Sequence, residues 1–465
     1  MKRLQNEIAS LVQRGADKHL RLAVTGLSRS GKTAFITSLV NQLINVHNGA
    51  ALPLFSVVRD ERLLGVRRVP QRDMGIARFS YDRGLAQLFD SPPAWPTPTR
   101  GISEMRLALR YRSQDSLLRY LKETSTLYLE IIDYPGEWLL DLPMLAQDFF
   151  SWSEQMTGLL HGERAALAAR WRQLTASLDP FAPADENQLA DISHAWTAYL
   201  HDCKHHGLHF IQPGRCVMPG EMAGAPALQF FPWPVGPDDD RAALSKADKN
   251  SNYGMLQARY HYYCQHVVKR FYKEHFVKFD RQIVLVDCLQ PLNSGPEAFN
   301  DMRMALTQLM QSFHYGQRTL LRRLFSPVID KLLFAATKAD HITTDQHASL
   351  VSLLRQMVQE AWQQAAFEGI KMDCVALSSV RATGAGTMMH QQQRFPALRG
   401  HRLSDGSPLT FYPGDVPPRF PADAFWQNGG FRFEAFRPPV MDSDRPLPHI
   451  RMDSALEFLL GDKLR

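Results

Sequence analysis

The chain has 465 residues and a formal net charge of +6, and 45% of its residues are hydrophobic and 22% charged. This composition is that of a globular protein, and the length predicts two or three domains. The excess of 53 basic over 47 acidic residues is too small to indicate nucleic-acid binding. No apolar run reaches the roughly 18 residues that would span a bilayer. Because the first residues also lack the apolar stretch of a signal peptide, we expect a cytoplasmic protein.

Residues 1–19 have the apolar spacing of an amphipathic helix, with Leu4, Ile8, Leu11 and Val12 on one face. Such a helix packs on the domain that follows or makes a weak contact with a membrane surface. We favour packing as the interpretation of this segment.

A phosphate-binding loop is predicted between residues 20 and 40. An apolar run ends at Gly26, and apolar residues with helical spacing begin after Thr33, so the segment is expected to be strand, loop and helix. The loop has the spacing G-x-x-x-x-G-K-T, in which Lys32 reaches the β- and γ-phosphates and Thr33 binds Mg²⁺. Backbone N–H groups and the helix N-terminus complete such a site. The expected binding residues here are Gly26, Ser28, Arg29, Ser30, Gly31, Lys32, Thr33 and Ala34.

A polar, proline-rich stretch, residues 48–99, precedes two predicted strands at 104–113 and 125–138. The second strand ends in Asp133-Tyr134-Pro135-Gly136, a D-x-x-G sequence. Asp133 is expected to be the second anchor of Mg²⁺, through a water molecule. The Gly136 N–H is expected to meet the γ-phosphate, and loss of that phosphate removes the contact. The pattern therefore predicts an order–disorder switch.

Residues 139–280 are predicted to form an inserted, mainly helical domain, because a strand-to-helix connection is too short to hold them. Its histidines and cysteines (His201, Cys203, His205, His206, His209 and Cys216) lack a recognised zinc spacing, and a solvated helix end is favoured over a metal site. The basic stretch 267–279 is similarly interpreted as a packed helix with a basic outer face. The five cysteines of the chain are scattered, as expected of free thiols.

The strand-rich core is predicted to resume over residues 281–382, with strands near 281–292, 331–340 and 372–380 and helices at 296–325 and 344–368. Asp340, in the sequence T-K-A-D, can accept hydrogen bonds from guanine N1–H and the 2-amino group, which adenine lacks. Lys338 would lay its aliphatic stem along the base. The expected base-binding residues are Lys338, Asp340, His341, Ser379 and Val380. Residues 383–465 are rich in Gly, Pro and aromatic residues, with a predicted hairpin at 428–436 and a last helix at 453–464.

The order of the motifs GLSRSGKT, TRGI, DYPG, TKAD and ALSSV resembles that of the Ras-like GTPases, and over nearly its full length the chain resembles the YcjX-like P-loop GTPases. The resemblance implies an α/β fold: a Ras-like G domain with a mostly parallel sheet and helices on both faces. That domain would comprise residues 1–138 and 281–382, interrupted by the helical insert at 139–280 and followed by a β-containing extension at 383–465. The resemblance also implies Mg²⁺-dependent binding of GTP and GDP.

The segment TPTRGI resembles the T-T-G-I of heterotrimeric G-protein α subunits, which makes Thr99 the expected Mg²⁺ ligand, with Thr97 as the alternative. Arg100 adjoins Thr99 and is a candidate for phosphate contact, whereas the catalytic arginine of those α subunits corresponds to Pro96 here. Trp95 either shields the nucleotide or packs in the core. The expected metal ligands are therefore Thr33, Thr99 and Asp133.

Two departures from the Ras-like pattern predict slow turnover and reduced base selectivity. Glu137 replaces the glutamine that orients the attacking water, and a carboxylate beside a polyanion is repelled. Thr337 replaces the usual asparagine of the base-recognition motif. The expected catalytic residues are Lys32, Thr99, Arg100, Gly136 and Glu137.

The leading functional hypothesis is a stress-associated GTPase switch. The resemblance of the chain to the YcjX-like P-loop GTPases also implies a link to phage-shock components. A protein partner is expected at the helical insert or the switch regions. Two alternatives stay open: a nucleotide-sensing scaffold with vestigial hydrolysis, and a P-loop phosphotransferase. A guanine-reading aspartate argues against the phosphotransferase.

Overall fold

The computed structural model describes residues 18–27, 29–99, 101–114, 123–236, 240–314, 329–367, 369–390, 393–427, 431–443 and 445–465. The chain divides into two compact units. Unit 1 comprises Met1–Tyr134, Phe279–Asn293 and Pro327–Arg465, and unit 2 comprises Pro135–Lys278 and Ser294–Ser326. This division differs from the expected domain boundaries, because residues 294–326 fall in unit 2 and residues 383–465 fall in unit 1.

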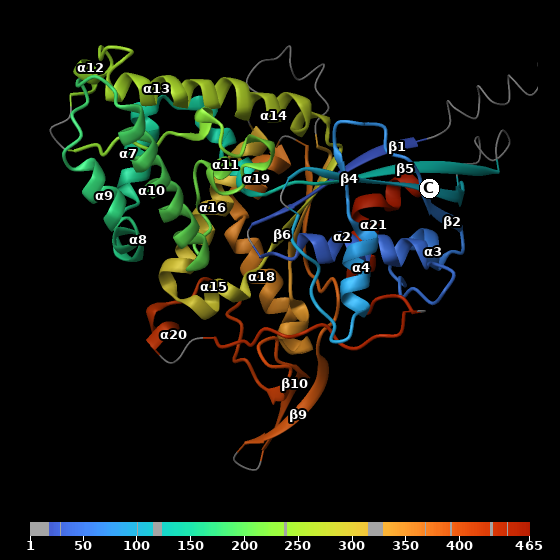
Figure 1. The fold of residues 1–465 in the computed structure, drawn as a ribbon. Helices are drawn as coiled ribbons and strands as arrows, with labels where there is room; N and C mark the ends of the chain where they lie inside the picture. Colours follow the sequence, from blue (N-terminus) through green and yellow to red (C-terminus); the bar gives the residue numbers. More distant parts are fainter. Residues whose placement is uncertain are drawn as a thin grey trace, which may run out of the picture. The chain divides into compact units, whose positions relative to one another are not determined.

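Unit 1 is built on a mixed sheet. Its described residues form an eight-stranded sheet in the order β2-β4-β5-β1-β6-β7-β8, with β3 paired to β4 (Figure 1). The pairs from β5 to β8 are parallel, and β4 is antiparallel to β2 and β5. The strands are β1 Lys18–Gly26, β2 Leu63–Arg68, β3 Ala77–Arg78, β4 Ser103–Arg112, β5 Thr124–Asp133, β6 Arg281–Val286, β7 Lys331–Ala336 and β8 Lys371–Ala376. A mainly parallel sheet with helices is consistent with a P-loop, Ras-like fold.

The strand register positions the site. Val24 of β1 pairs with Asp133 of β5, and Gly26 of β1 pairs with Leu285 of β6. Every residue of β6 is buried, as is typical of a parallel strand covered on both faces. Because parallel strands end at the same edge, the loops that follow β1, β5 and β6 meet there.

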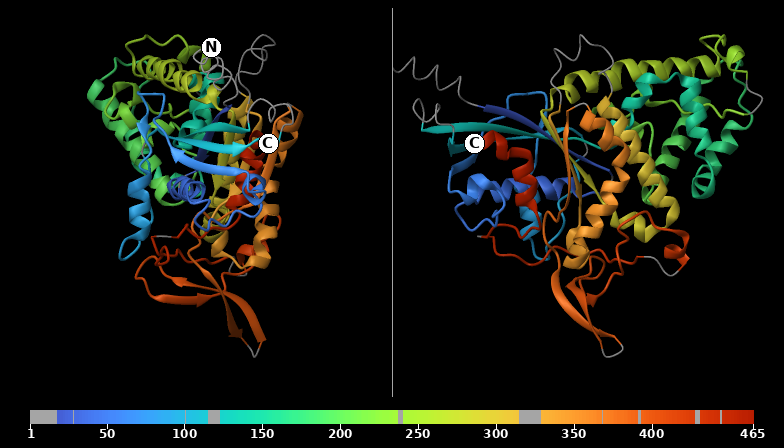
Figure 2. Two further views of the ribbon diagram at one scale, coloured as in Figure 1. Left: turned by 90° about the vertical axis from the view of Figure 1, so that its right-hand side faces the viewer. Right: turned by 180° about the vertical axis from the view of Figure 1, so that it is seen from behind.

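Helices cover the sheet of unit 1 on both faces. Helices α2 (Lys32–Ile44) and α21 (Met452–Leu460) share one hydrophobic core with β1, β4 and β5. Helix α18 (His347–Met357) contacts β7 and β8. Figures 1 and 2 show α2 and α21 on one face of the sheet and α18 on the other. The last helix of the chain therefore belongs to the core of the sheet.

Several predicted elements are confirmed and others are wrong. The strands expected near 20–26, 104–113, 125–133, 281–286, 331–336 and 372–376 are present. The polar, proline-rich stretch 48–99, for which no element was predicted, contains β2, β3, α3 (Ser56–Arg59) and α4 (Tyr81–Phe89). Residues 1–17 of the predicted first helix lie outside the described part, and Lys18 and His19 belong to β1 instead. Unit 1 also holds α19 Gln359–Phe367, α20 Asp423–Gln427 and the single turns Ala339–His341, Thr344–Gln346 and Gly461–Leu464.

The predicted hairpin at 428–436 is wrong for its described residues. Residues 431–436 form no strand and pair only through an isolated bridge between Phe436 and Arg402. The described residues form a three-stranded antiparallel sheet earlier in the chain, from β9 (Gly384–His390), β10 (Gln393–His401) and β11 (Pro408–Phe411). The tertiary bridge thus overrides the local alternation of apolar residues.

Unit 2 is helical in its described residues. Its helices are α6 Glu137–Leu140, α7 Phe149–Gly158, α8 Gly162–Leu167, α9 Ala169–Thr175, α10 Glu186–His205, α11 Gly214–Val217, α12 Arg241–Leu244, α13 Asn252–Tyr262, α14 Lys269–Glu274 and α16 Pro296–His314. A π-helical segment, Tyr263–Val268, joins α13 to α14, and α15 (Leu289–Ser294) crosses the boundary with unit 1. Short turns lie at Leu142–Ala146, Gly220–Met222, Pro226–Leu228 and Phe276–Lys278.

An aromatic cluster and a buried ion pair hold unit 2 together. The rings of Trp152 and Tyr260 lie 5.2 Å apart, and Phe149 packs beside both. The Arg164 guanidinium contacts the Asp301 carboxylate at 2.5 Å, and both side chains are almost fully buried. No helix in the described part of the chain is both long and apolar enough to cross a membrane.

Candidate functional site

The phosphate loop requires glycine at two positions for different reasons. A Cβ on Gly26 would lie 2.3 Å from Ser30 Oγ and 2.6 Å from the Leu285 carbonyl oxygen, so no side chain fits there. Gly31 has φ 84°, in the left-handed region that glycine adopts without strain. No side chain caps α2, which begins at Lys32, so its first N–H groups face the loop. The loop therefore presents an anion-binding helix N-terminus.

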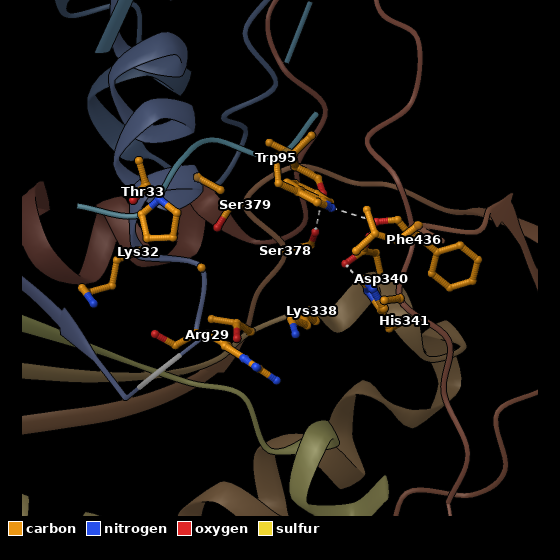
Figure 3. Close-up of a pocket in the computed structure, with 18 of the residues that line it drawn as sticks. Arg29, Lys32, Thr33, Trp95, Lys338, Asp340, His341, Ser378, Ser379 and Phe436 are labelled. Carbon is orange, nitrogen blue, oxygen red and sulfur yellow. Dashed lines mark hydrogen bonds and ion pairs between the residues drawn. The ribbon is translucent and has the colours of Figure 1, made fainter. Parts of the chain in front are cut away.

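A cavity of about 390 Å³ opens within unit 1 over this loop (Figure 3). The predicted site residues that line it are Arg29, Ser30, Gly31, Lys32, Thr33, Ala34, Trp95, Thr99, Lys338, Asp340, His341, Ser379 and Val380. Pro98, Thr337, Ser378, Leu403, Ala435 and Phe436 complete the lining. Gly26 packs beneath the loop, and Ser28 and Arg100 lie outside the described residues. One cavity thus joins the G-K-T loop to the T-K-A-D segment.

Asp133 lies buried at the end of β5, with 1% of its surface exposed. Burial raises the pKa of its carboxyl group, and the nearby Lys32 and Thr99 lower it only in part. Neither carboxylate oxygen has a hydrogen-bond partner of ordinary geometry among the described residues. A buried carboxylate of this kind needs a compensating charge, and hard oxygen donors suit Mg²⁺. Thr33, Thr99 and Asp133 therefore fit a magnesium ion.

The structure distinguishes the two candidate threonines. The Gln87 amide nitrogen donates to Thr97 Oγ1 at 2.9 Å, and the Thr97 N–H donates to Gln87 Oε1 at 3.0 Å. Thr97 is therefore held by the side chain of α4, whereas Thr99 lines the cavity together with Thr33. The geometry favours Thr99 as the metal ligand. In the described part of the chain, which includes residues 201–216, no group of three or more His, Cys, Asp or Glu side chains is placed to hold a metal.

The base-reading end of the cavity is centred on Asp340, of which 3% is exposed. Burial alone raises the pKa of this carboxyl group, but His341 and the Ala382 N–H outweigh it and hold the pKa below its ordinary value. Asp340 Oδ2 accepts from the Ala382 N–H at 2.7 Å. Asp340 Oδ1 lies 3.3 Å from His341 Nδ1, and Figure 3 shows this contact. The side chain is thus ionised and fixed in orientation. An ionised, fixed carboxylate is the acceptor that guanine requires.

Lys338 is positioned by a residue that the sequence analysis missed. It has φ 59°, and its Nζ lies 2.5 Å from Asp287 Oδ2. Asp287 is 1% exposed and directly follows β6. The ion pair holds the lysine stem along the wall of the cavity. An acidic residue immediately after an apolar strand was a signal that could have indicated Asp287.

A distant segment forms the remaining wall. Trp95 Nε1 donates to the Phe436 carbonyl oxygen at 2.8 Å (Figure 3). The rings of His341 and Phe436 lie 5.1 Å apart in an edge-on arrangement. Trp95 therefore both lines the cavity and ties the segment before Thr99 to residues near the C-terminus. No local sequence signal pointed to Phe436.

Comparison with known proteins places this arrangement in a family. The model of the YcjX-like family, DUF463, matches residues 20–464, which include every predicted site residue. The chain belongs to this family. It is 72% identical to the Ras-like GTPase YcjX of Escherichia coli (strain K12) over 465 residues, 100% of both chains. It is 46% identical to the Ras-like GTPase YcjX of Shewanella oneidensis over 471 residues, which cover 98% of this chain and 96% of the relative.

In this YcjX-like chain, the residues after Asp133 pass into unit 2. The unit boundary lies between Tyr134 and Pro135, inside the D-x-x-G sequence. Glu137 is 4% exposed, and Lys204 Nζ of α10 donates to its Oε1 at 2.7 Å. Lys204 was not predicted, because only the fold of the helical unit brings it to Glu137.

Proposed function

We propose that this chain binds GTP and GDP with Mg²⁺, hydrolyses GTP slowly and acts as a molecular switch. The observation that carries the proposal is the single cavity that joins the G-K-T loop to Asp340. A phosphate loop at one end and a fixed carboxylate acceptor at the other are what a guanine nucleotide requires. Both relatives are named as Ras-like GTPases, and this supports the same proposal.

In this proposal the phosphates lie over the N-terminus of α2, with Lys32 beside the β- and γ-oxygens. Thr33 and Thr99 would hold Mg²⁺, with Asp133 behind it, and the ion would neutralise charge on the phosphates. Asp340 would accept from guanine, and Lys338, held by Asp287, would lie along the base. We assign unit 1 as the G domain and unit 2 as the helical insert.

The switch would act through the D-x-x-G segment. A contact between the Gly136 N–H and the γ-phosphate would be lost when GTP is hydrolysed, and the segment would then change its conformation. We propose that a protein partner reads this change at the helical insert or at the segment around Thr99, in a stress response of the phage-shock type in the cytoplasm.

Relative nucleotide affinity tests the proposal. Unlabelled GTP, GDP, ATP and ADP compete with a fluorescent GDP analogue for the purified full-length protein in Mg²⁺. We expect GTP and GDP to bind at least about tenfold more tightly than ATP and ADP, because adenine leaves Asp340 unpaired. Release of γ-phosphate in a single turnover then measures hydrolysis. Equal affinities for GTP and ATP would overturn the guanine assignment, and failure to bind any nucleotide would overturn the proposal.

One observation favours a second candidate, a nucleotide-sensing scaffold in which hydrolysis is vestigial. Glu137 replaces the usual glutamine, and its carboxylate is already engaged by Lys204. Tight GTP binding with no phosphate release over many hours would favour the scaffold. Measurable Mg²⁺-dependent release would favour the GTPase.

A further inference from the structure

A second cavity, of about 310 Å³, adjoins the first within unit 1. Thr33, Pro98 and Thr99 line both cavities, so the two meet where the proposed magnesium ion and terminal phosphate lie. The guanidinium-bearing residues Arg78 and Arg83 line the second cavity. It is therefore a cationic recess at the γ-phosphate end of the site.

Both arginines are exposed, so their guanidinium groups are free to meet a ligand from solvent. Neither the Arg78 nor the Arg83 side chain has a hydrogen bond or an ion pair with the described residues. Arg68 behaves differently, because its guanidinium contacts both oxygens of Asp82, on the same helix as Arg83, at 2.7 and 2.8 Å. The acidic residue beside Arg83 is thus already occupied by another arginine. Arg83 is therefore available to an anion in the cavity, with which a guanidinium forms charge-assisted hydrogen bonds.

The helix that carries Arg83 is fixed against the phosphate-loop helix. Gly84 of α4 packs so closely on α2 that an added Cβ would lie 2.8 Å from Thr37 Oγ1 and 3.6 Å from Pro96 Cβ. Gln87, one turn further along α4, holds Thr97 through two hydrogen bonds. The same short helix therefore positions Arg83 and the segment that carries Thr99.

We propose that Arg83, with Arg78, contacts the terminal phosphate of bound GTP and acts as an arginine supplied in cis for hydrolysis. In that reaction the oxygen of water bonds to the γ-phosphorus, and the bond from phosphorus to the β–γ bridging oxygen breaks. GDP leaves with the electron pair, and the water proton passes to the phosphate or to solvent. Negative charge on the γ-oxygens and the bridging oxygen is greatest in the transition state, where a guanidinium is most stabilising.

The resemblance to heterotrimeric G-protein α subunits puts Pro96, which carries no charge, where those proteins have their catalytic arginine. Lys204 is engaged by Glu137. Arg100, the arginine indicated by the sequence, lies outside the described residues and is the direct rival in the experiment.

The experiment compares Arg83→Ala, Arg78→Ala and the double variant with wild type in the full-length protein. Arg67→Ala is the matched control, because Arg67 is an exposed arginine of β2 that lines neither cavity. We expect single-turnover GTP hydrolysis to fall about 20-fold in the double variant, the ratio between GTPases with and without an arginine in cis. GDP affinity should be unchanged, because GDP lacks the γ-phosphate. Wild type should also bind aluminium fluoride with GDP, a mimic of the transferring phosphoryl group, and the double variant should not.

The inference rests on the proposed GTPase function, and the outcomes separate the two. Normal hydrolysis by the double variant, or a loss confined to Arg100→Ala, overturns the assignment of Arg78 and Arg83 and leaves the GTPase intact. An equal loss of GDP affinity would show that the arginines hold the diphosphate, which also overturns it. A wild-type protein that neither binds nor hydrolyses GTP overturns both.

Discussion

The two ends of the proposed nucleotide site are built in different ways. The phosphate end comes from one contiguous run, residues 26–34, whose backbone makes the binding surface. The base end is assembled from four segments far apart in the sequence, around Trp95, Asp340, Val380 and Phe436. Phosphate binding therefore depends on local backbone geometry, whereas base selectivity depends on tertiary contacts. Substitutions at the two ends should fail in different ways.

The largest effect is expected at the phosphate end. Lys32→Ala should lower GTP affinity by at least about 100-fold, because it removes the point charge beside the β- and γ-oxygens. Lys371→Ala is the matched control, since Lys371 is an exposed lysine at the start of β8. Unchanged GTP affinity in a folded Lys32→Ala protein would show that the loop does not bind the phosphates.

At the base end, Asp340→Asn should change selectivity as well as affinity. GTP affinity should fall roughly 10- to 100-fold with the loss of charged hydrogen bonds, and XTP should gain, because its 2-oxo group accepts from an amide. Asp345→Asn, at an exposed residue of the following turn, is the control. A wild-type ratio of GTP to XTP affinity would show that Asp340 does not read the base.

Asp133→Asn tests the metal at the phosphate end and has opposite effects on binding and stability. We expect Mg²⁺-dependent GTP affinity to fall about tenfold. Without ligand, the wild type should lose stability relative to the variant as pH rises, because its folded-state pKa is raised above the unfolded value. The wild type has its full stability below the pKa that the Asp133 carboxyl has in the unfolded chain. It loses this stability as pH rises through the pKa that the same group has in the folded protein. Thermal unfolding across this range, with and without Mg²⁺ and GTP, checks both signs.

Trp95→Phe tests the base end of the site, which is built from tertiary contacts. It keeps an aromatic ring but removes the donor to the Phe436 carbonyl oxygen. We expect GTP and GDP affinities to fall together by about fivefold, the effect of one neutral hydrogen bond. Trp362→Phe is the control, because Trp362 lies outside the site. A change in GTP affinity alone would mean that Trp95 acts through the γ-phosphate rather than through the wall of the base site.

The smallest effect is expected for Glu137→Gln. It removes a negative charge and weakens the ion pair with Lys204, which should raise single-turnover hydrolysis about threefold and leave GDP affinity unchanged. A loss of turnover would show that the Glu137 carboxylate positions water or acts as a base. Lys204→Met in parallel shows whether the effect depends on the ion pair.

Local pattern was enough to predict the strand and the helix that flank the G-K-T loop. The requirement for glycine at Gly31 arises from a positive φ within the loop, whereas at Gly26 it arises from close approach to Ser30 of the loop and to Leu285 of β6. The hairpin at 428–436 failed for the opposite reason. Alternation of apolar residues also occurs in an extended segment whose apolar side chains pack on other segments. Phe436 is an example, because its backbone forms a bridge with Arg402 and its ring packs against His341.

The partners of the site residues could not be read from the sequence. Asp287 is 51 residues from Lys338, and Gln87 is 10 residues from Thr97. Neither spacing has a local signature. The hydrogen bonds of Gln87 to Thr97 are also what favours Thr99 over Thr97 at the cavity. The sequence did not single out Arg83, because its position beside the cavity depends on the close packing of Gly84 of the same helix on α2.

The sequence by itself determined the order of the motifs, the spacing of the G-K-T loop and the position of the Asp340 carboxylate shortly after β7, because these depend on residues close together along the chain. The tertiary structure decided which threonine lines the cavity, what holds Asp340 and Lys338, and which wall closes the base end. Those properties depend on side chains brought together by packing over long sequence separations, such as Trp95 and Phe436. A hydrogen bond or an ion pair is specified by distance in space, and only the folded chain sets that distance.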